Sequence, residues 1–161
     1  MIRTPTRWLV YGSVAVGLLL AIIPIPLIVE PMRPFFLGML LAYWSMEAPN
    51  NVAIGTAFIV GLFADLITAS LLGEHALRLV VLVFLVQRFR ARLRFFPLWQ
   101  QALAMGLLLG NDQLLVAISH WLSGAPTLPW RTAFSPLLAM LLWPWLYVLL
   151  DMARLRARER G

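Results

Sequence analysis

Uncharged apolar stretches follow one another along this chain, and its charged residues lie almost entirely between them. Residues 8–29 carry no charge, and as a helix they would be about 33 Å long at the standard rise per residue. That length is enough to cross a hydrocarbon core about 30 Å thick. Further apolar stretches follow between residues 34 and 150, and the intervals between them are too short for a soluble domain. The pattern predicts a single polytopic membrane domain over residues 1–161.

The composition supports this class and excludes several functions. Of 161 residues, 61% are hydrophobic and 12% are charged, whereas about a quarter of a soluble domain is charged. Cysteine is absent, so disulfides and thiolate metal sites are excluded. His75 and His120 lie on different predicted spans without clustered carboxylates, which does not favour a metal centre. Because the sequence also lacks the common hydrolase and nucleotide-binding motifs, we expect no enzyme, no cofactor and no nucleic-acid partner.

The arginines predict how the chain crosses the membrane. Ten of the 13 form three clusters: Arg3 and Arg7; Arg88, Arg90, Arg92 and Arg94; and Arg154, Arg156, Arg158 and Arg160. If all three clusters face the cytoplasm, as the positive-inside rule favours, an even number of crossings separates each cluster from the next. Six helical spans satisfy this condition, with both termini cytoplasmic. They are expected near residues 8–29, 32–48, 52–72, 73–89, 96–122 and 132–151, of which the second and fourth are short and could be re-entrant.

Three charged residues fall inside the predicted spans: Asp65, Arg78 and Asp112. A charge near the bilayer centre costs about 2.5–3.5 kcal/mol on insertion scales, so each needs a reason. All three lie at one depth, about 4–5 Å outside the midplane by helix rise. We hypothesise that Arg78 bridges both aspartates, because its planar guanidinium can serve two carboxylates. Two alternatives remain: Arg78 extends to the outer headgroups and pairs with Glu74, or the aspartates bind protons or cations in a transporter.

Small residues recur every four positions around Asp65. The seam consists of Ala53, Ala57, Gly61 and Ala69, with Asp65 in the same register. Such a seam lets two helices approach closely within lipid. It predicts either packing between two helices of this chain or an interface with a partner protein.

The arginines at positions 88, 90, 92 and 94 are expected to form a cytoplasmic basic loop. Contact with anionic lipid would contribute about 1 kcal/mol per arginine, which is the simpler interpretation. The alternative is docking of an acidic cytoplasmic partner. Seven aromatic residues are interpreted as residues of the membrane interface: Phe95, Phe96, Trp99, Trp121, Trp130, Trp143 and Trp145.

Four short strings, taken in order, resemble the MreD family of rod shape-determining membrane proteins of bacteria. They are Tyr43 and Trp44 followed by Pro49; Gly55, Gly61, Leu62 and Asp65; the run from Leu72 to Leu77 with Gly73; and the run from Phe96 to Gln101 with Pro97, Trp99 and Gln100. The length of the chain also fits the family, so the resemblance covers nearly the whole chain.

The resemblance implies a non-enzymatic scaffold of the inner membrane that helps maintain rod shape. Its implied partners are MreC, MreB filaments, and the RodA glycosyltransferase with its class B penicillin-binding protein. It also implies a fold similar to the six-helix substrate-binding subunits of energy-coupling-factor transporters. The candidate contacts are the small-residue seam and the aromatic ends of spans two and five.

Two other functions remain open at this point. A small-molecule uptake subunit would have an outward-facing pocket lined by Asp65, Asp112 or the tryptophans. An assembly factor for a different membrane complex is the third reading.

Overall fold

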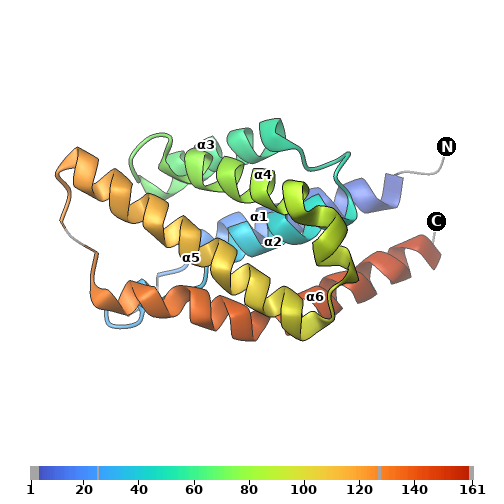
Figure 1. Cartoon of the computed structure of the whole chain (residues 1–161). Helices are drawn as coiled ribbons and strands as arrows, with labels where there is room; N and C mark the ends of the chain where they lie inside the picture. The colour runs from blue at the N-terminus through green and yellow to red at the C-terminus, as the bar shows by residue number, and fades with distance from the viewer. Residues whose placement is uncertain (1–3, 25, 127, 160–161) are drawn as a thin grey trace.

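The computed structural model describes residues 4–24, 26–126 and 128–159, and within these residues all regular structure is helical. The prediction of six helices is confirmed. The elements are α1 (Thr4–Ile22), η1 (Glu30–Met32), α2 (Phe36–Glu47), α3 (Ile54–Thr68), α4 (Glu74–Phe95), α5 (Leu98–Ser123), η2 (Trp130–Ala133) and α6 (Phe134–Glu159), where η marks a 3₁₀ turn. The helices form one elongated bundle with connections at its two ends (Figure 1).

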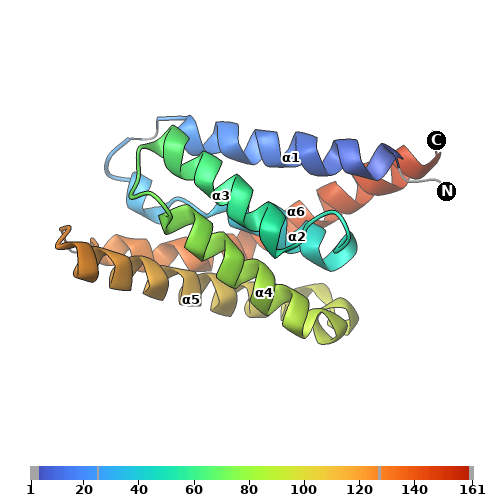
Figure 2. The same ribbon diagram turned by 90° about the horizontal axis from the view of Figure 1, so that it is seen from above.

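Successive helices run in opposite directions, so the two chain ends lie at the same end of the bundle (Figures 1 and 2). This end also holds the C-terminal turns of α2 and α4, and we call it the basic end. It carries the arginine clusters, of which Arg3 and Arg160 lie outside the described residues. The opposite end, with Asp65, Glu74 and Asp112, is called the acidic end.

Helix boundaries differ most from the predicted spans at three places. Helix α1 ends at Ile22 rather than near residue 29, because Pro24 follows and proline disfavours helical backbone at the residue before it. Helix α4 continues to Phe95 because its last turns hold good helix formers and no breaker before Pro97. The arginines at 88, 90, 92 and 94 therefore lie on a helix, and the predicted basic loop is wrong. Helix α6 likewise continues past residue 151 to Glu159.

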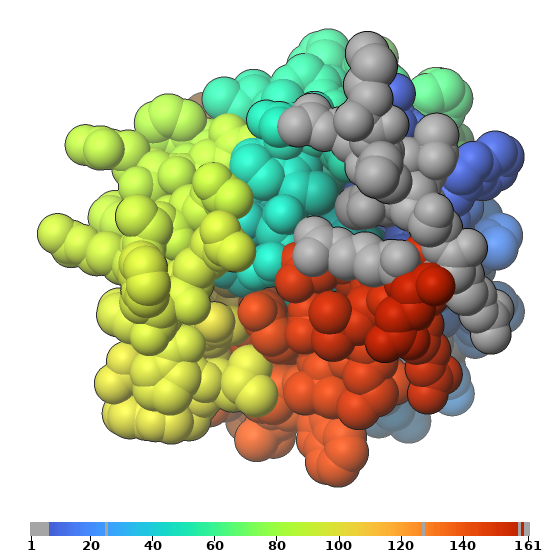
Figure 3. Space-filling view, turned by 90° about the vertical axis from the view of Figure 1, so that its right-hand side faces the viewer, coloured from blue at the N-terminus to red at the C-terminus, as the bar shows by residue number. Residues whose placement is uncertain are grey.

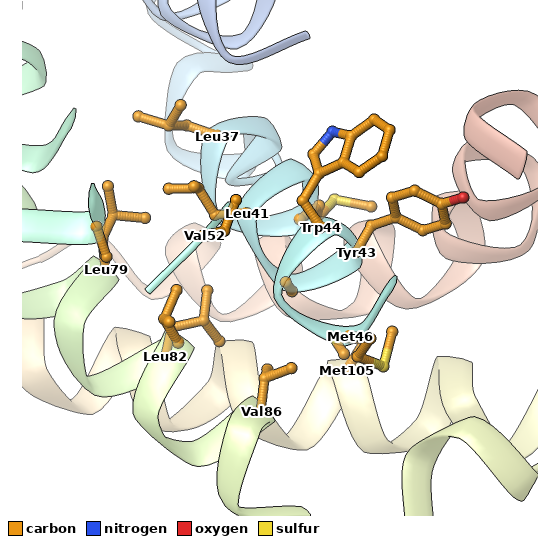
Figure 4. Packing of buried hydrophobic residues seen from close by; sticks show 14 of the residues in the cluster. Leu37, Leu41, Tyr43, Trp44, Met46, Val52, Leu79, Leu82, Val86 and Met105 are labelled. Atoms are coloured by element: carbon orange, nitrogen blue, oxygen red, sulfur yellow. The ribbon is translucent and has the colours of Figure 1, made fainter. Parts of the chain in front are cut away.

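Helix α2 occupies the centre of the bundle. Its 12 residues measure about 18 Å, and every residue from Leu37 to Met46 is buried. A helix that is apolar all round can face either lipid or protein, and the burial of α2 shows that it is enclosed by protein. Leucine, valine and methionine side chains from α4 and α5 pack on one side of α2 (Figure 4), and α1 and α6 contact its other sides.

Helix α2 is short, as predicted for the second span, and the other short helix is α3. Helix α3 has 15 residues, whereas α4 has 22, which is about 33 Å. The whole of α4 matches the thickness of a bilayer, but the helix is rich in arginine from Arg88 onward, so its apolar part is short, as predicted for the fourth span.

The outer surface of the bundle is apolar along most of its length. Large exposed apolar side chains occur on every peripheral helix, for example Trp8 on α1, Phe63 and Leu66 on α3, Leu107 on α5 and Leu141 on α6. By length and composition, α5 and the segment Trp130–Ala157 could each cross a membrane. Contiguous apolar surface of this extent marks an interaction with lipid or with another protein.

Candidate functional site

Arg78 on α4 and Asp112 on α5 form a buried two-pronged ion pair at the acidic end. The Arg78 Nε lies 2.8 Å from Asp112 Oδ1, and Nη2 lies 2.6 Å from Oδ2. The Asp112 side chain is 2% exposed and that of Arg78 is 11% exposed. The guanidinium also stacks over the Phe35 ring, with 4.2 Å between its central carbon and the ring centre. Glu74 is a weaker partner, 3.9 Å from Arg78 Nη1. This arrangement joins α4 to α5.

Asp65 has different partners, so the predicted bridge from Arg78 to both aspartates is wrong. Its Oδ2 accepts the backbone N–H of Gly73 at 2.8 Å, and its Oδ1 accepts that of His75, also at 2.8 Å. The Ser70 hydroxyl and His75 Nδ1 contact Oδ1 at 2.9 Å each. The first turn of a helix has N–H groups without partners and a partial positive charge. Asp65 therefore caps α4 from the neighbouring helix α3.

The turn between α3 and α4 makes this cap possible. Ala69 has a φ of 51° and Gly73 a φ of 94°, both in the left-handed region. Glycine adopts that region without steric cost, which explains why Gly73 can turn its N–H toward Asp65. The arrangement positions the backbone at the start of α4, which is a structural function.

Ser70, His75 and Asp65 contact one another, but their geometry is not that of a catalytic triad. The Nδ1 atom of His75 lies 2.9 Å from Asp65 and 3.1 Å from Ser70. A proton relay uses the two ring nitrogens for two different partners. Within residues 4–24, 26–126 and 128–159, no three histidine, aspartate or glutamate side chains are grouped to hold a metal ion.

The small-residue seam faces α4 only in its middle part. Ala57 and Gly61 are buried, together with Ala64, which the four-residue repeat did not include, whereas Ala53 and Ala69 are exposed. A Cβ atom added at Gly61 would lie 2.3 Å from the Cα of Ala76. The two backbones are thus too close for any side chain at this position. The buried part of the seam packs inside the chain.

A second ion-pair cluster lies at the basic end, and the sequence analysis did not predict it. Its centre is Glu47, the last residue of α2, whose side chain is 5% exposed. Glu47 Oε2 accepts a hydrogen bond from Arg154 of α6, and Oε1 lies 3.6 Å from Nε of Arg94 on α4. Arg154 also contacts Asp151 at 2.9 Å. One carboxylate thereby connects three helices. The sequence did contain a signal for this cluster, because Glu47 is a lone charge at the end of an otherwise apolar span.

Tyr43 and Trp44 are fully buried, so they are not partner contacts as the aromatic end of span two was expected to be. The Tyr43 hydroxyl lies 3.4 Å from Asp151 Oδ1, and Trp44 Nε1 donates to Ser13 Oγ at 2.6 Å. Figure 4 shows the two rings pointing away from α2 in different directions. Each ring therefore fixes α2 against a different helix, α6 for Tyr43 and α1 for Trp44.

The motif between α4 and α5 combines a structural residue with exposed ones. Gln101 is buried, and its Nε2 donates to the carbonyls of Leu93 and Phe96 at 3.0 and 3.2 Å. It thus satisfies acceptors at the end of α4, which a helix terminus leaves open. Trp99 is exposed and remains available to lipid or a partner.

The other positions of the family motifs and of the interfacial aromatics differ in exposure. Pro97 is exposed, Pro49 and Gln100 are half-buried, and Trp143 is fully buried. The predicted interfacial position of Trp143 is therefore wrong, whereas Trp121, Trp130 and Trp145 are exposed.

A pocket of about 180 Å³ opens near the acidic end. Its polar lining includes Arg33, His75, Arg78, Gln113 and Ser135, without either aspartate or any tryptophan. The lining differs from the one expected for an uptake subunit. The volume is also below the roughly 300–1,000 Å³ of typical small-molecule sites.

These features define a class: an all-helical bundle with an apolar exterior, whose buried carboxylates hold helices in place. A family model described as rod shape-determining protein MreD matches residues 2–153. The rod shape-determining protein MreD of Haemophilus influenzae is 30% identical over 143 residues, which is 89% of this chain and 88% of the relative. The chain belongs to the MreD family, as the resemblance predicted.

No solved structure matches the chain. Its similarity to the energy-coupling-factor subunits stays a prediction.

Proposed function

We propose that this protein is a non-enzymatic, six-span scaffold of the bacterial inner membrane that supports side-wall elongation and rod shape. The observation that carries the proposal is the family match over residues 2–153. The geometry agrees with a scaffold, because the buried carboxylates Asp65, Asp112 and Glu47 bind the chain's own arginines, hydroxyls and backbone amides.

The proposed orientation places the basic end in the cytoplasm. Eight described arginines belong to the clusters at that end, from Arg7 to Arg158. Arginines flanking membrane spans are retained on the cytoplasmic side. The short helices α2 and α3 are compatible with six spans. Helix α2 is enclosed by protein, and the bilayer can become thinner around α3.

Cysteine labelling tests this orientation directly, because the chain has no native cysteine. Asn50→Cys lies in the α2–α3 connection at the basic end, and Ala125→Cys lies in the α5–α6 connection at the acidic end. A membrane-impermeant maleimide added to intact inner-membrane spheroplasts should label position 125 and spare position 50 until the membrane is permeabilised. Labelling of both positions from one side would contradict the six-span topology.

The proposed partners are MreC, MreB filaments, and RodA with its class B penicillin-binding protein. Because the middle of the small-residue seam is buried, the contact surfaces are the exposed apolar faces of the peripheral helices. Phe58, Phe63 and Leu66 on α3 form one such face. Helix–helix association in lipid depends on close packing of side chains, and large rings on one face can provide it.

Depletion of the protein in its rod-shaped host tests the function. We expect rods to become spheres, and rods to return when the wild-type chain is expressed. The matched variants are Phe63→Ala, on the exposed face of α3, and Leu107→Ala, an exposed residue of α5. Loss of rescue by the α3 variant alone would locate a partner contact. Unchanged cell shape on clean depletion would contradict the proposal.

A further inference from the structure

A basic hollow of about 570 Å³ lies along the last two turns of α4. It is lined by Gln87, Arg88, Arg90, Ala91, Arg94 and Phe95. Three guanidinium groups and no carboxylate therefore face it. The proposed function does not use this hollow, and the ion pairs at the basic end involve only part of its charge.

The three arginines differ in how much of their charge is already paired. Arg90 donates its Nε to the carbonyl of Met46 at 2.7 Å, which fixes the side chain without neutralising it. Arg94 shares Glu47 with Arg154 and is itself 47% exposed. Arg88 is exposed and makes no ion pair with any carboxylate of the described residues. The hollow thus has a surplus of positive charge.

Apolar side chains lie beside this charge. Phe95 is 89% exposed, and Phe84, one turn before Arg88 on the same face of α4, is also exposed. Figure 3 shows that the C-terminal part of α4, in yellow-green, occupies one side of this end, with the end of α2, in teal, next to it. A ligand bound here contacts guanidinium groups at one end and an apolar helix surface at the other.

We propose that this hollow binds the headgroup phosphate of an anionic glycerophospholipid of the inner leaflet. Guanidinium groups pair with phosphate oxygens through parallel hydrogen bonds, and basic pockets on the cytoplasmic side of membrane helices suit such headgroups. The acyl chains lie against Phe84, which precedes Arg88 by one turn on the same face of α4. The inference rests on the proposed orientation, which brings this part of α4 to the inner leaflet.

Native mass spectrometry of the full chain in detergent tests the proposal. The probes are phosphatidylglycerol, cardiolipin, phosphatidylcholine and inorganic phosphate, each titrated separately. We expect saturable binding of the two anionic lipids, with phosphatidylcholine and inorganic phosphate at least tenfold weaker. Equal binding of phosphatidylcholine would overturn the proposal, and so would inorganic phosphate binding as tightly as the lipids.

A matched pair of variants locates the site. Arg88→Gln removes the charge without a carboxylate partner, and we expect about fivefold weaker binding of anionic lipid, the effect of one arginine near a charged membrane surface. Arg92→Gln removes the same charge from an exposed residue of α4 outside the hollow, and binding should stay within twofold. Arg88→Lys should restore most of the affinity. Equal losses in the two glutamine variants would show diffuse attraction and overturn the proposal.

Cell-shape rescue by the same variants separates the two proposals. Absence of selective lipid binding by a chain that sustains rod shape rejects only the lipid site. Failure of the wild-type chain to affect cell shape rejects only the proposed function.

Discussion

At the acidic end there are two buried aspartates, and each has its own set of hydrogen-bond donors. At the basic end a single buried carboxylate, that of Glu47, pairs with arginines of two other helices. Asp112 and Arg78 neutralise each other in a closed pair, and Asp65 satisfies the first turn of α4. At the basic end, by contrast, arginines greatly outnumber carboxylates, and Arg88 and Arg92 stay exposed without an ion pair among the described residues. The comparison distinguishes charged residues that hold the helices together from exposed arginines that are free to bind a partner.

The closed pair at the acidic end gives the largest expected effect. Asp112→Ala leaves the Arg78 guanidinium buried without its two-pronged partner, and this should reduce the free energy of unfolding by about 3–5 kcal/mol. Denaturant titration in mixed micelles measures the change. Asn111→Ala, at the exposed neighbouring position, should stay within about 0.5 kcal/mol. Replacing Arg78 and Asp112 together by leucine should recover much of the loss, and a double variant as unstable as Asp112→Ala would contradict this account.

The middle and the start of α3 should respond differently to the same substitution. Gly61→Ala pushes the added methyl into the backbone of Ala76, and we expect a loss of about 1–3 kcal/mol in unfolding free energy. Gly55→Ala meets nothing within 4 Å and should be neutral or stabilising by up to about 1 kcal/mol. The same titration measures both variants, and a similar loss in both would show that close packing is not confined to the Gly61 contact.

The shared carboxylate at the basic end should be less costly to remove. Glu47→Gln weakens the contacts with Arg94 and Arg154, but Arg94 is close to water and Arg154 keeps Asp151. We expect a loss of about 1–2 kcal/mol in unfolding free energy. Glu159→Gln, on an exposed residue of α6, is the control and should have no measurable effect. A larger loss for Glu47→Gln than for Asp112→Ala would reverse the comparison of the two ends.

The cap on α4 should give the smallest and most local effect. Asp65→Asn keeps one oxygen acceptor but replaces the other with a donor, so one of the two backbone N–H groups loses its partner. We expect about 1 kcal/mol of destabilisation. Hydrogen–deuterium exchange should rise over residues 70–77 and stay unchanged over residues 48–53 at the opposite end. Uniform acceleration over the whole chain would contradict a local capping role.

The number of helices and the gathering of the arginines at one end followed from features that are local in the sequence. Apolar length predicts a span, and arginine clusters predict which ends lie together. The pairing of Arg78 with Asp112 formed part of the predicted bridge, because residues at equal depth on neighbouring helices can meet. These inferences needed only helix rise and charge.

The rest depended on three-dimensional packing that no local pattern encodes. Helix α2 is apolar on every side, so its sequence does not distinguish a lipid-facing helix from an enclosed one. Asp65 could not be assigned to the α4 cap without the left-handed backbone at Ala69 and Gly73. Glu47 binds an arginine 107 residues away, and several arginines were equally plausible partners.

The enclosed position of α2 has a consequence for how the protein is made. Helix α2 leaves the ribosome before α4 and α6, so in the proposed membrane topology its sides first face lipid or the insertion machinery. The apolar sequence of α2 is compatible with either environment. Glu47, however, has no arginine partner until Arg94 of α4 is synthesised, and it lacks its second partner, Arg154, until α6 is complete. The ion pair between Glu47 and Arg154 therefore forms last during synthesis. Translation arrest before α6 should leave an intermediate with an incompletely paired Glu47, which quality-control proteases can recognise.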